Sequence, residues 1–150
     1  MTISPKMKQL VGKATAPRAI EVEKGQVRRF ARAIGEAAAI HFDEAAARAA
    51  GFPSLVAPPT FATALIDPEA FLDELGWDLQ SVMHRAEEFE YFRPVCAGDV
   101  LDVTHRLADL YEQAGAGGQS LVFAIVETRI ADSRSRPVLK GRRVLVKLKS

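Results

Sequence analysis

Four long stretches in the second half of the chain have the pattern of β-strands, and they limit most strictly what the chain can form: Val82–Phe92, Val100–Tyr111, Gln119–Ile130 and Val138–Leu148. Leu101, Val103 and Leu107 alternate with polar residues, as in a strand with one buried face. The run from 121 to 126 is apolar on both faces, which is typical of a central strand covered on both sides. Short loops rich in glycine or serine separate the last three stretches. This half of the chain therefore predicts an antiparallel sheet with hairpin connections.

The first half of the chain has a helical pattern instead. After a short edge strand expected at Ile20–Lys24, apolar residues recur at the spacing of one helix face: Val27, Phe30, Ala31 and Ile34. Gly35 is well placed to end this helix. Asp43 is a good N-cap for a second short helix that runs to Gly51.

A third apolar segment, Thr60–Ile66, follows Pro58 and Pro59. Proline in the first helical turn removes no hydrogen bond, because the amide at that position has no partner in the helix. The segment has little polar character, so we expect a helix that is buried on most sides. A mixed loop then extends from Glu69 to Leu79.

The order of these elements, helices first and a meander of long strands after them, predicts an α+β fold. One buried helix against a long, curved antiparallel sheet is the hotdog arrangement. We expect a single domain of this kind over residues 1–150, a length that suits one core. One chain of this size supplies little to cover the rest of the sheet or its edge, so a dimer is expected.

Composition excludes several classes of function. A formal net charge of +1 gives no electrostatic reason to expect nucleic acid as a partner. The single cysteine, Cys96, cannot form an intramolecular disulfide, and His41, His84 and His105 are too scattered for a metal site. No stretch approaches the roughly 20 apolar residues of a membrane span, and the N-terminus carries no secretory signal. These features predict a cytoplasmic protein without a metal.

Four stretches carry recognisable motifs. Phe30–Asp43, with the alanine-rich helix after it, matches G-D-x-N-P-x-H-x-D in part, and Val56–Phe61 contains A-P-P-T-F. Phe92–Leu101 contains R-P-V-x-x-G-D-x-L, and His84–Glu87 has the form H-x-x-E. In order and spacing, over about Val11 to Val146, the chain resembles the MaoC-like hydratases and dehydratases, and in particular their N-terminal-type dehydratase branch. The resemblance implies a hotdog fold that acts on acyl thioesters.

The resemblance also implies a catalytic pair. Adding water to a 2-enoyl thioester needs a base that activates the water, an acid that protonates the α-carbon, and a donor that stabilises the developing enolate. In the family, an aspartate and a histidine five residues later hold the water, and Glu36 and His41 match these positions. The chemistry needs no metal or redox cofactor. The expected activity is that of an (R)-specific enoyl-thioester hydratase or 3-hydroxyacyl-thioester dehydratase.

Further substrate contacts are expected around this pair. In the family, a backbone amide at the start of the central helix binds the thioester carbonyl, which here indicates the segment Pro59, Thr60 and Phe61, the last two through their amides. His84 is a candidate for the wall of the acyl site. The C-terminal stretch from Ser133 to Ser150 has seven basic residues and no acidic one. Two of them, Arg142 and Arg143, are candidates for binding the phosphates of coenzyme A or of a carrier protein's prosthetic arm.

Alternatives remain open at the level of the sequence. A solvated sheet face is the simpler explanation of the basic stretch. Ala38 and Ala39 replace the asparagine and proline of the family motif, and Pro58 replaces a glycine that would donate an amide. These changes favour a non-catalytic acyl-binding subunit of a heteromeric dehydratase, whereas Glu36 and His41 favour catalysis. A thioesterase is a third reading, because hotdog folds also carry that chemistry. The partner is then an acyl-CoA or acyl-carrier-protein thioester, with a homodimer or a heterodimer of hotdog subunits.

Overall fold

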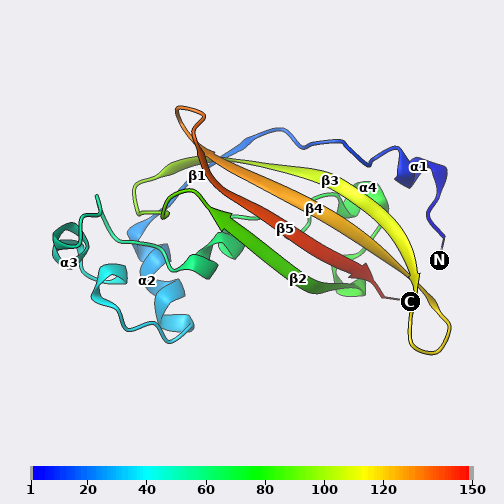
Figure 1. The fold of residues 1–150 in the computed structure, drawn as a ribbon, viewed down its shortest axis with the longest axis horizontal. Helices are drawn as coiled ribbons and strands as arrows, with labels where there is room; N and C mark the ends of the chain where they lie inside the picture. The colour runs from blue at the N-terminus through cyan, green and yellow to red at the C-terminus, as the bar shows by residue number, and fades with distance from the viewer. Residues whose placement is uncertain (1, 149–150) are drawn as a thin grey trace.

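Five antiparallel strands form one curved sheet in the computed structural model, which describes residues 2–148. The strand order is β1–β3–β4–β5–β2. Figure 1 shows the long strands lying side by side across the molecule. Their bounds are β1 (Arg18–Glu21), β2 (Val82–Tyr91), β3 (Val100–Ala114), β4 (Ser120–Asp132) and β5 (Pro137–Lys147). The four strands predicted in the second half are confirmed to within a few residues at each end, and the apolar run at 121–126 lies in β4, the central strand.

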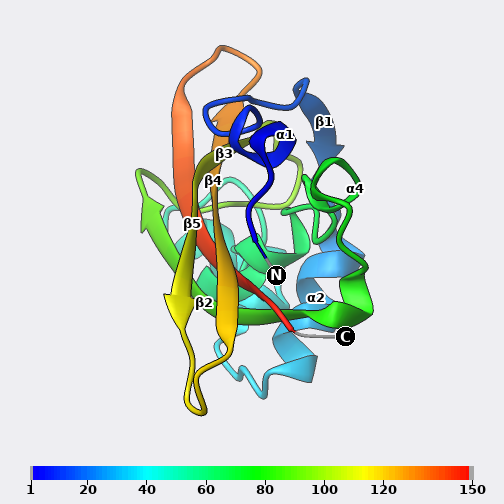
Figure 2. The ribbon, with the colours of Figure 1, turned by 90° about the vertical axis from the view of Figure 1, so that its right-hand side faces the viewer.

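Short helices cover one face and one end of this sheet (Figures 1 and 2). The longest is α2, which buries Val27 and Ala31 and ends before Gly35, whose φ of 75° is favourable only for glycine. Asp43 caps α3, as predicted, by accepting hydrogen bonds from the amides of Ala45 and Ala46. The α-helices are α1 (Pro5–Lys8), α2 (Lys24–Ala33), α3 (Glu44–Ala49) and α4 (Leu72–Leu75), and the 3₁₀ helices are η1 (Ala39–His41), η2 (Pro59–Ala64) and η3 (Leu79–Ser81).

The central segment is a short 3₁₀ helix of six residues rather than a long α-helix. It forms η2, in which Phe61 and Ala62 are buried, and Leu65 and Ile66 after it are buried as well. Prolines limit η2 on both sides, since Pro58 precedes it, Pro59 begins it and Pro68 follows it, and short helical pieces commonly adopt the 3₁₀ form. The expected loop at Glu69–Leu79 contains α4. The hotdog arrangement is thus confirmed, but the central helix is not buried on most sides as expected, since Pro59, Thr60, Thr63 and Ala64 are exposed.

The core consists of two apolar clusters under the inner face of the sheet. One surrounds η2 and includes Phe61 and Leu65; the other surrounds α4 and includes Trp77 and Leu72. Between them, the inner face carries a polar row in which His105 of β3 lies opposite Thr128 of β4. The two apolar clusters are therefore separated by the buried polar pair His105 and Thr128.

None of the helices between residues 2 and 148 is both long enough and apolar enough to cross a bilayer.

The side chains of the basic C-terminal stretch lie in different environments. Arg136 pairs with Asp132 at the β4–β5 turn, Arg143 is buried, and Lys140 lies over the ring of Phe92. Lys149, which belongs to the same stretch, lies outside the described residues.

Candidate functional site

The loop between α2 and α3 carries the first half of the site. Gly35 turns the chain at the end of α2, and the amide of Glu36 donates to the carbonyl of Ala31. The Glu36 side chain folds back on its own loop, where Oε1 accepts hydrogen bonds from the amides of Ala37 at 3.1 Å and Ala38 at 3.4 Å. These two contacts hold one carboxylate oxygen and leave Oε2 free to face His41. The length of a glutamate side chain is thus taken up within the loop.

His41 ends η1 and is 6% exposed. Its Nδ1 lies 2.6 Å from the carbonyl oxygen of Val56. Because a carbonyl can only accept, Nδ1 must carry the hydrogen, and in the neutral ring Nε2 then holds the lone pair. The amide of Val56 in turn donates to the carbonyl of Ile40, so the Val56 segment holds η1 in place from both directions.

The free atoms of these two side chains face one another. Nε2 of His41 lies 4.0 Å from Oε2 of Glu36, which is beyond a direct hydrogen bond. A water molecule within hydrogen-bond distance of both atoms can donate one hydrogen to each, since both atoms are acceptors when the imidazole is neutral. The loop therefore presents two acceptors at the separation that suits a shared water.

A cavity of about 590 Å³ opens beside His41. Its lining is mostly apolar and comes from the η1 loop, the segment before η2 and the stretch after β2: Ile40, His41, Val56, Ala57, Pro59, Tyr91, Phe92, Arg93, Pro94 and Val95. The R-P-V residues of the Phe92–Leu101 motif form one wall of it, and the chain turns after them. There Arg93 makes a two-pronged ion pair with Asp99, at 2.9 and 3.1 Å, which fixes the turn.

The beginning of η2, where Pro59 lines this cavity, has one amide without a backbone partner among the described residues. Pro58 and Pro59 have no amide hydrogen, and the amide of Phe61 already donates to the carbonyl of Pro58 at 2.8 Å. The amide of Thr60 lies in the first turn, where helical amides have no partner within the helix, and no backbone carbonyl of residues 2–148 accepts from it. Of the two amides expected from the sequence, Thr60 is the available one.

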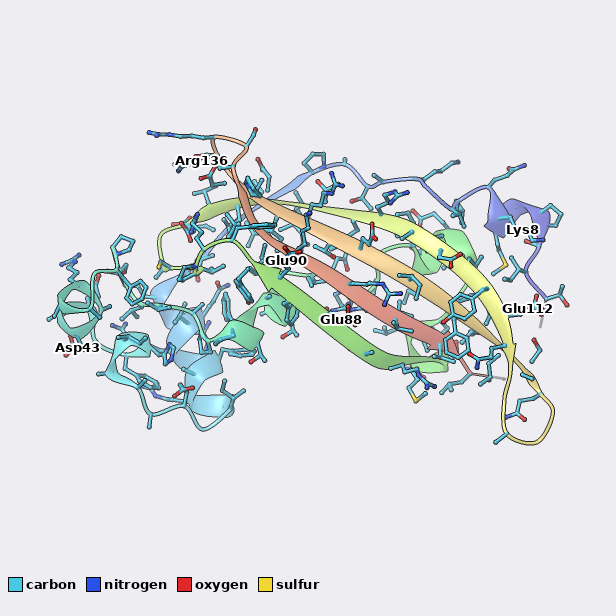
Figure 3. The ribbon with its side chains drawn as sticks, in the orientation of Figure 1. Lys8, Asp43, Glu88, Glu90, Glu112 and Arg136 are labelled. Atoms are coloured by element: carbon cyan, nitrogen blue, oxygen red, sulfur yellow. The ribbon has the colours of Figure 1, made fainter. Side chains whose placement is uncertain are left out.

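The structure does not bring the other predicted substrate contacts to this cavity. His84 pairs with Glu87 at 3.3 Å, and Arg143 pairs with the same carboxylate at 3.1 Å, with both Glu87 and Arg143 side chains 8% exposed. Arg142 comes directly before Arg143, and its side chain lies on the opposite face of the sheet, next to Glu88. Figure 3 shows Glu88 on the face turned to the viewer. Consecutive strand residues point to opposite faces, so Arg142 and Arg143 cannot share one phosphate.

Two contributors to the site were missed from the sequence. Val56 acts through its carbonyl, which no side-chain pattern reveals. Tyr91 lines the cavity and donates its hydroxyl hydrogen to the carbonyl of Pro59, 32 residues away. Its position directly before the F-R-P-V stretch of a family motif was the available signal.

Comparisons with known proteins agree with this architecture. A family model described as the FAS1-like dehydratase domain region matches residues 9–140. A UPF0336 protein of Saccharopolyspora erythraea is 36% identical over 132 residues, which cover 85% of this chain and 81% of that protein. A UPF0336 protein of Mycobacterium tuberculosis is 31% identical and covers 93% of this chain and 84% of its own length.

Solved structures show the same fold. The HadBC 3R-hydroxyacyl-ACP dehydratase complex of Mycobacterium tuberculosis contains a chain that superposes with a TM-score of 0.79 at 25% identity, covering 91% of this chain and 96% of that one. The (R)-hydratase PhaJ1 of Pseudomonas aeruginosa gives a TM-score of 0.70 at 18% identity and covers 93% of this chain and 83% of its own. With the family model matching most of its length, this chain belongs to the FAS1-like dehydratase domain region family, and its fold is that of a solved MaoC-like dehydratase.

Proposed function

We propose that the protein is a hydro-lyase that adds water to 2-enoyl thioesters and removes it from (R)-3-hydroxyacyl thioesters. One observation supports the proposal above all: two hydrogen-bond acceptors, Glu36 Oε2 and His41 Nε2, face each other 4.0 Å apart, and His41 lines an apolar cavity. Both groups are held by backbone contacts that leave these atoms free.

In the hydration direction, the shared water donates one hydrogen to Nε2 of His41 and the other to Oε2 of Glu36. Its oxygen attacks the β-carbon of the substrate. As the new carbon–oxygen bond forms, one O–H bond of the water breaks and its proton moves to Nε2 of His41. The electrons of the carbon–carbon double bond shift to the thioester carbonyl and give an enolate.

The enolate then collapses. Its carbonyl re-forms while the α-carbon takes one proton from the Glu36–His41 pair, so that both groups return to their starting states. The amide of Thr60 is the donor proposed for the enolate oxygen, where the partial positive charge at a helix start favours an anion. No further reactant is needed, because the water supplies both the hydroxyl and, by way of the pair, the α-hydrogen.

The substrate class follows from the cavity and the relatives. The apolar lining suits an acyl chain, and the structural neighbours include proteins named as an (R)-hydratase and as a 3R-hydroxyacyl-ACP dehydratase. We propose an acyl-CoA or acyl-carrier-protein thioester as the substrate, and no metal or redox group takes part. The R configuration is taken from these relatives.

A second candidate is supported by the open edge of the sheet. Strand β2 has β5 on one side and no strand on the other among the described residues, so its ten residues can pair with a second hotdog chain. Two structural neighbours are named as complexes, HadBC and ChsH1–ChsH2. We therefore keep the reading in which this chain is the acyl-binding subunit of a heterodimer, beside the catalytic homodimer.

One assay separates these readings. The purified protein is incubated with crotonyl-CoA and with a longer enoyl-CoA while the loss of enoyl absorbance and the release of free thiol are followed together. Absorbance loss without thiol supports the hydratase, thiol release supports a thioesterase, and inertness until another hotdog subunit is added supports the second candidate. Cys96 does not contribute to the measured release of free thiol, because it is buried and burial raises the pKa of its thiol.

Two substitutions then test the roles of the pair. Glu36→Gln and His41→Ala should each lower kcat by about 10²- to 10⁴-fold, the usual contribution of a positioned acid or base. Glu90→Gln, at an exposed glutamate of β2, is the matched control and should leave kcat unchanged. Full activity in both Glu36→Gln and His41→Ala would refute the mechanism.

A further inference from the structure

We propose that Tyr91 is a positioning residue: its hydroxyl fixes and polarises the Pro59–Thr60 peptide group, whose N–H receives the thioester carbonyl oxygen. This inference rests on the proposed function, since it deepens the part of the mechanism that binds the enolate. It concerns a residue that does not touch the reacting atoms and acts through the backbone.

Tyr91 is held in place on three sides. It is the last residue of β2, directly before the R-P-V turn, and its ring forms part of the cavity wall. The ring packs against the apolar cluster around η2 and lies edge-on to Phe89 with centroids 6.3 Å apart. From this position the hydroxyl donates to the carbonyl of Pro59, the first residue of η2. An aromatic ring fixed by packing thus directs one hydrogen bond at the start of the central segment.

The carbonyl of Pro59 and the amide of Thr60 belong to the same peptide group. A peptide group is planar and trans, so its C=O and N–H point in opposite directions, and fixing one fixes the other. A hydrogen bond to the carbonyl also polarises the group and strengthens its N–H as a donor. Helical amides point toward the N-terminal end, which here is bordered by the cavity-lining residues Ala57 and Pro59.

The hydrogen bond from Tyr91 compensates for the amide hydrogens that Pro58 and Pro59 lack. Because Pro58 and Pro59 cannot donate and the amide of Phe61 is occupied, Thr60 carries the only free amide in the first turn of η2. A site with one donor depends strongly on the direction of that donor, since stabilisation of an oxyanion falls steeply when the donor is misaligned.

The Tyr91 hydroxyl remains a donor over the whole working pH range. Burial raises its pKa to about 12, so the phenol stays protonated near neutrality. A deprotonated phenol would repel the carbonyl of Pro59 and release the peptide group.

The experiment compares wild type with Tyr91→Phe, and with Tyr111→Phe as the matched control. The chain has two tyrosines, and Tyr111 stacks on Phe123 and does not line the cavity. Each protein is saturated with 2,4-hexadienoyl-CoA, a conjugated thioester whose absorption moves to longer wavelength when its carbonyl is polarised. Binding and kcat with crotonyl-CoA are measured on the same samples, and thermal melting reports whether each variant folds.

Wild type and Tyr111→Phe should show the same shift to longer wavelength. Tyr91→Phe should bind within about threefold of wild type, lose most of the shift and lose about tenfold in kcat, the effect of one neutral hydrogen bond. Thr60→Pro, which removes the proposed donor itself, should lose the shift as well. Adding Tyr91→Phe to Thr60→Pro should then change nothing further, because both act on one peptide group.

The possible failures are distinct. A Tyr91→Phe variant that keeps the full shift, or that loses binding by much more than threefold, overturns the positioning role. A wild-type protein that binds and polarises the dienoyl thioester without hydrating crotonyl-CoA overturns the hydratase proposal and leaves the role of Tyr91 standing. A wild-type protein that binds no thioester overturns both.

Discussion

Two buried histidines show how hydrogen bonds decide which residue is available for chemistry. His41 uses only Nδ1, on the carbonyl of Val56, and keeps Nε2 for Glu36. His105 uses both nitrogens: Nδ1 lies 2.9 Å from Thr128 Oγ1, and Nε2 accepts from the amide of Asp67 at 3.3 Å. With both nitrogens occupied by the fold, His105 is a structural residue.

His105 should make stability depend on pH. Its pKa is lowered by burial, so below the ordinary value near 6.5 the unfolded state binds the proton more readily than the folded state. The free energy of unfolding should therefore be fully retained above about pH 6.5 and fall as the pH drops toward the lowered pKa of the folded state. Thermal melts between pH 8 and pH 5 measure this slope, and His105→Gln should flatten it.

The control for this slope is Gln80→Ala, a substitution at an exposed position that removes no titratable group, so the pH dependence should stay as in wild type. The carboxylates whose pKa is lowered by hydrogen bonds, Glu44, Glu112 and Asp132, lose their contribution only at lower pH, outside this window. If the stability of His105→Gln depends on pH as strongly as that of the wild type, the pH dependence comes from other groups.

Among the elements, α3 is the short helix on which the site loop depends. It has six residues, so its own propensity contributes little, and its N-cap lies two residues after His41. Oδ1 of Asp43 accepts from the amides of Ala45 at 2.7 Å and Ala46 at 3.2 Å. These bonds satisfy two of the unpaired amides at the helix start.

Asp43→Ala should lower the free energy of unfolding by about 1 kcal/mol, the usual loss for an N-cap. Urea unfolding of the variant measures it. Asp43→Ser, which keeps a capping oxygen, should recover most of the loss. Equal destabilisation by Ala and Ser would show that the carboxylate acts in another way, such as through its charge near the helix start.

At the scale of the whole molecule, a buried ion pair joins the edge strand β2 to its neighbour β5. Glu87 of β2 lies opposite Arg143 of β5, and both side chains are 8% exposed. Removing Arg143 leaves the buried Glu87 carboxylate with only the half-exposed His84 beside it, whereas removing both members leaves no buried charge. The pair lies in the same row of the sheet as Leu107 and Val126 of the second cluster.

Arg143→Met should therefore lower the free energy of unfolding by about 3–5 kcal/mol, and the double variant Glu87→Leu/Arg143→Met by clearly less. A matched control exists in Arg106 and Glu127, which also face each other across two strands but are 49% and 41% exposed. Arg106→Met should cost less than about 1 kcal/mol. Chemical unfolding of all four proteins measures these differences; similar losses at the two pairs would contradict the role of burial.

The sequence alone determined the elements whose signal is local. The alternation in β3, the apolar run in β4, the end of α2 at Gly35 and the cap at Asp43 depend on neighbouring residues, so the sheet and the helices near the site could be predicted. The pairing of Glu36 with His41, five residues apart in one loop, was instead expected from the resemblance to the MaoC-like family.

The tertiary structure decided what depends on residues far apart in the chain. The tautomer of His41 depends on a carbonyl 15 residues away, and the start of η2 depends on a hydroxyl 32 residues away. The separation of Arg143 from Arg142 depends on which face of the sheet each side chain takes and on Glu87 of another strand. Hydrogen bonds and ion pairs of this kind form only when folding brings the partners together, and no local pattern in the chain encodes them.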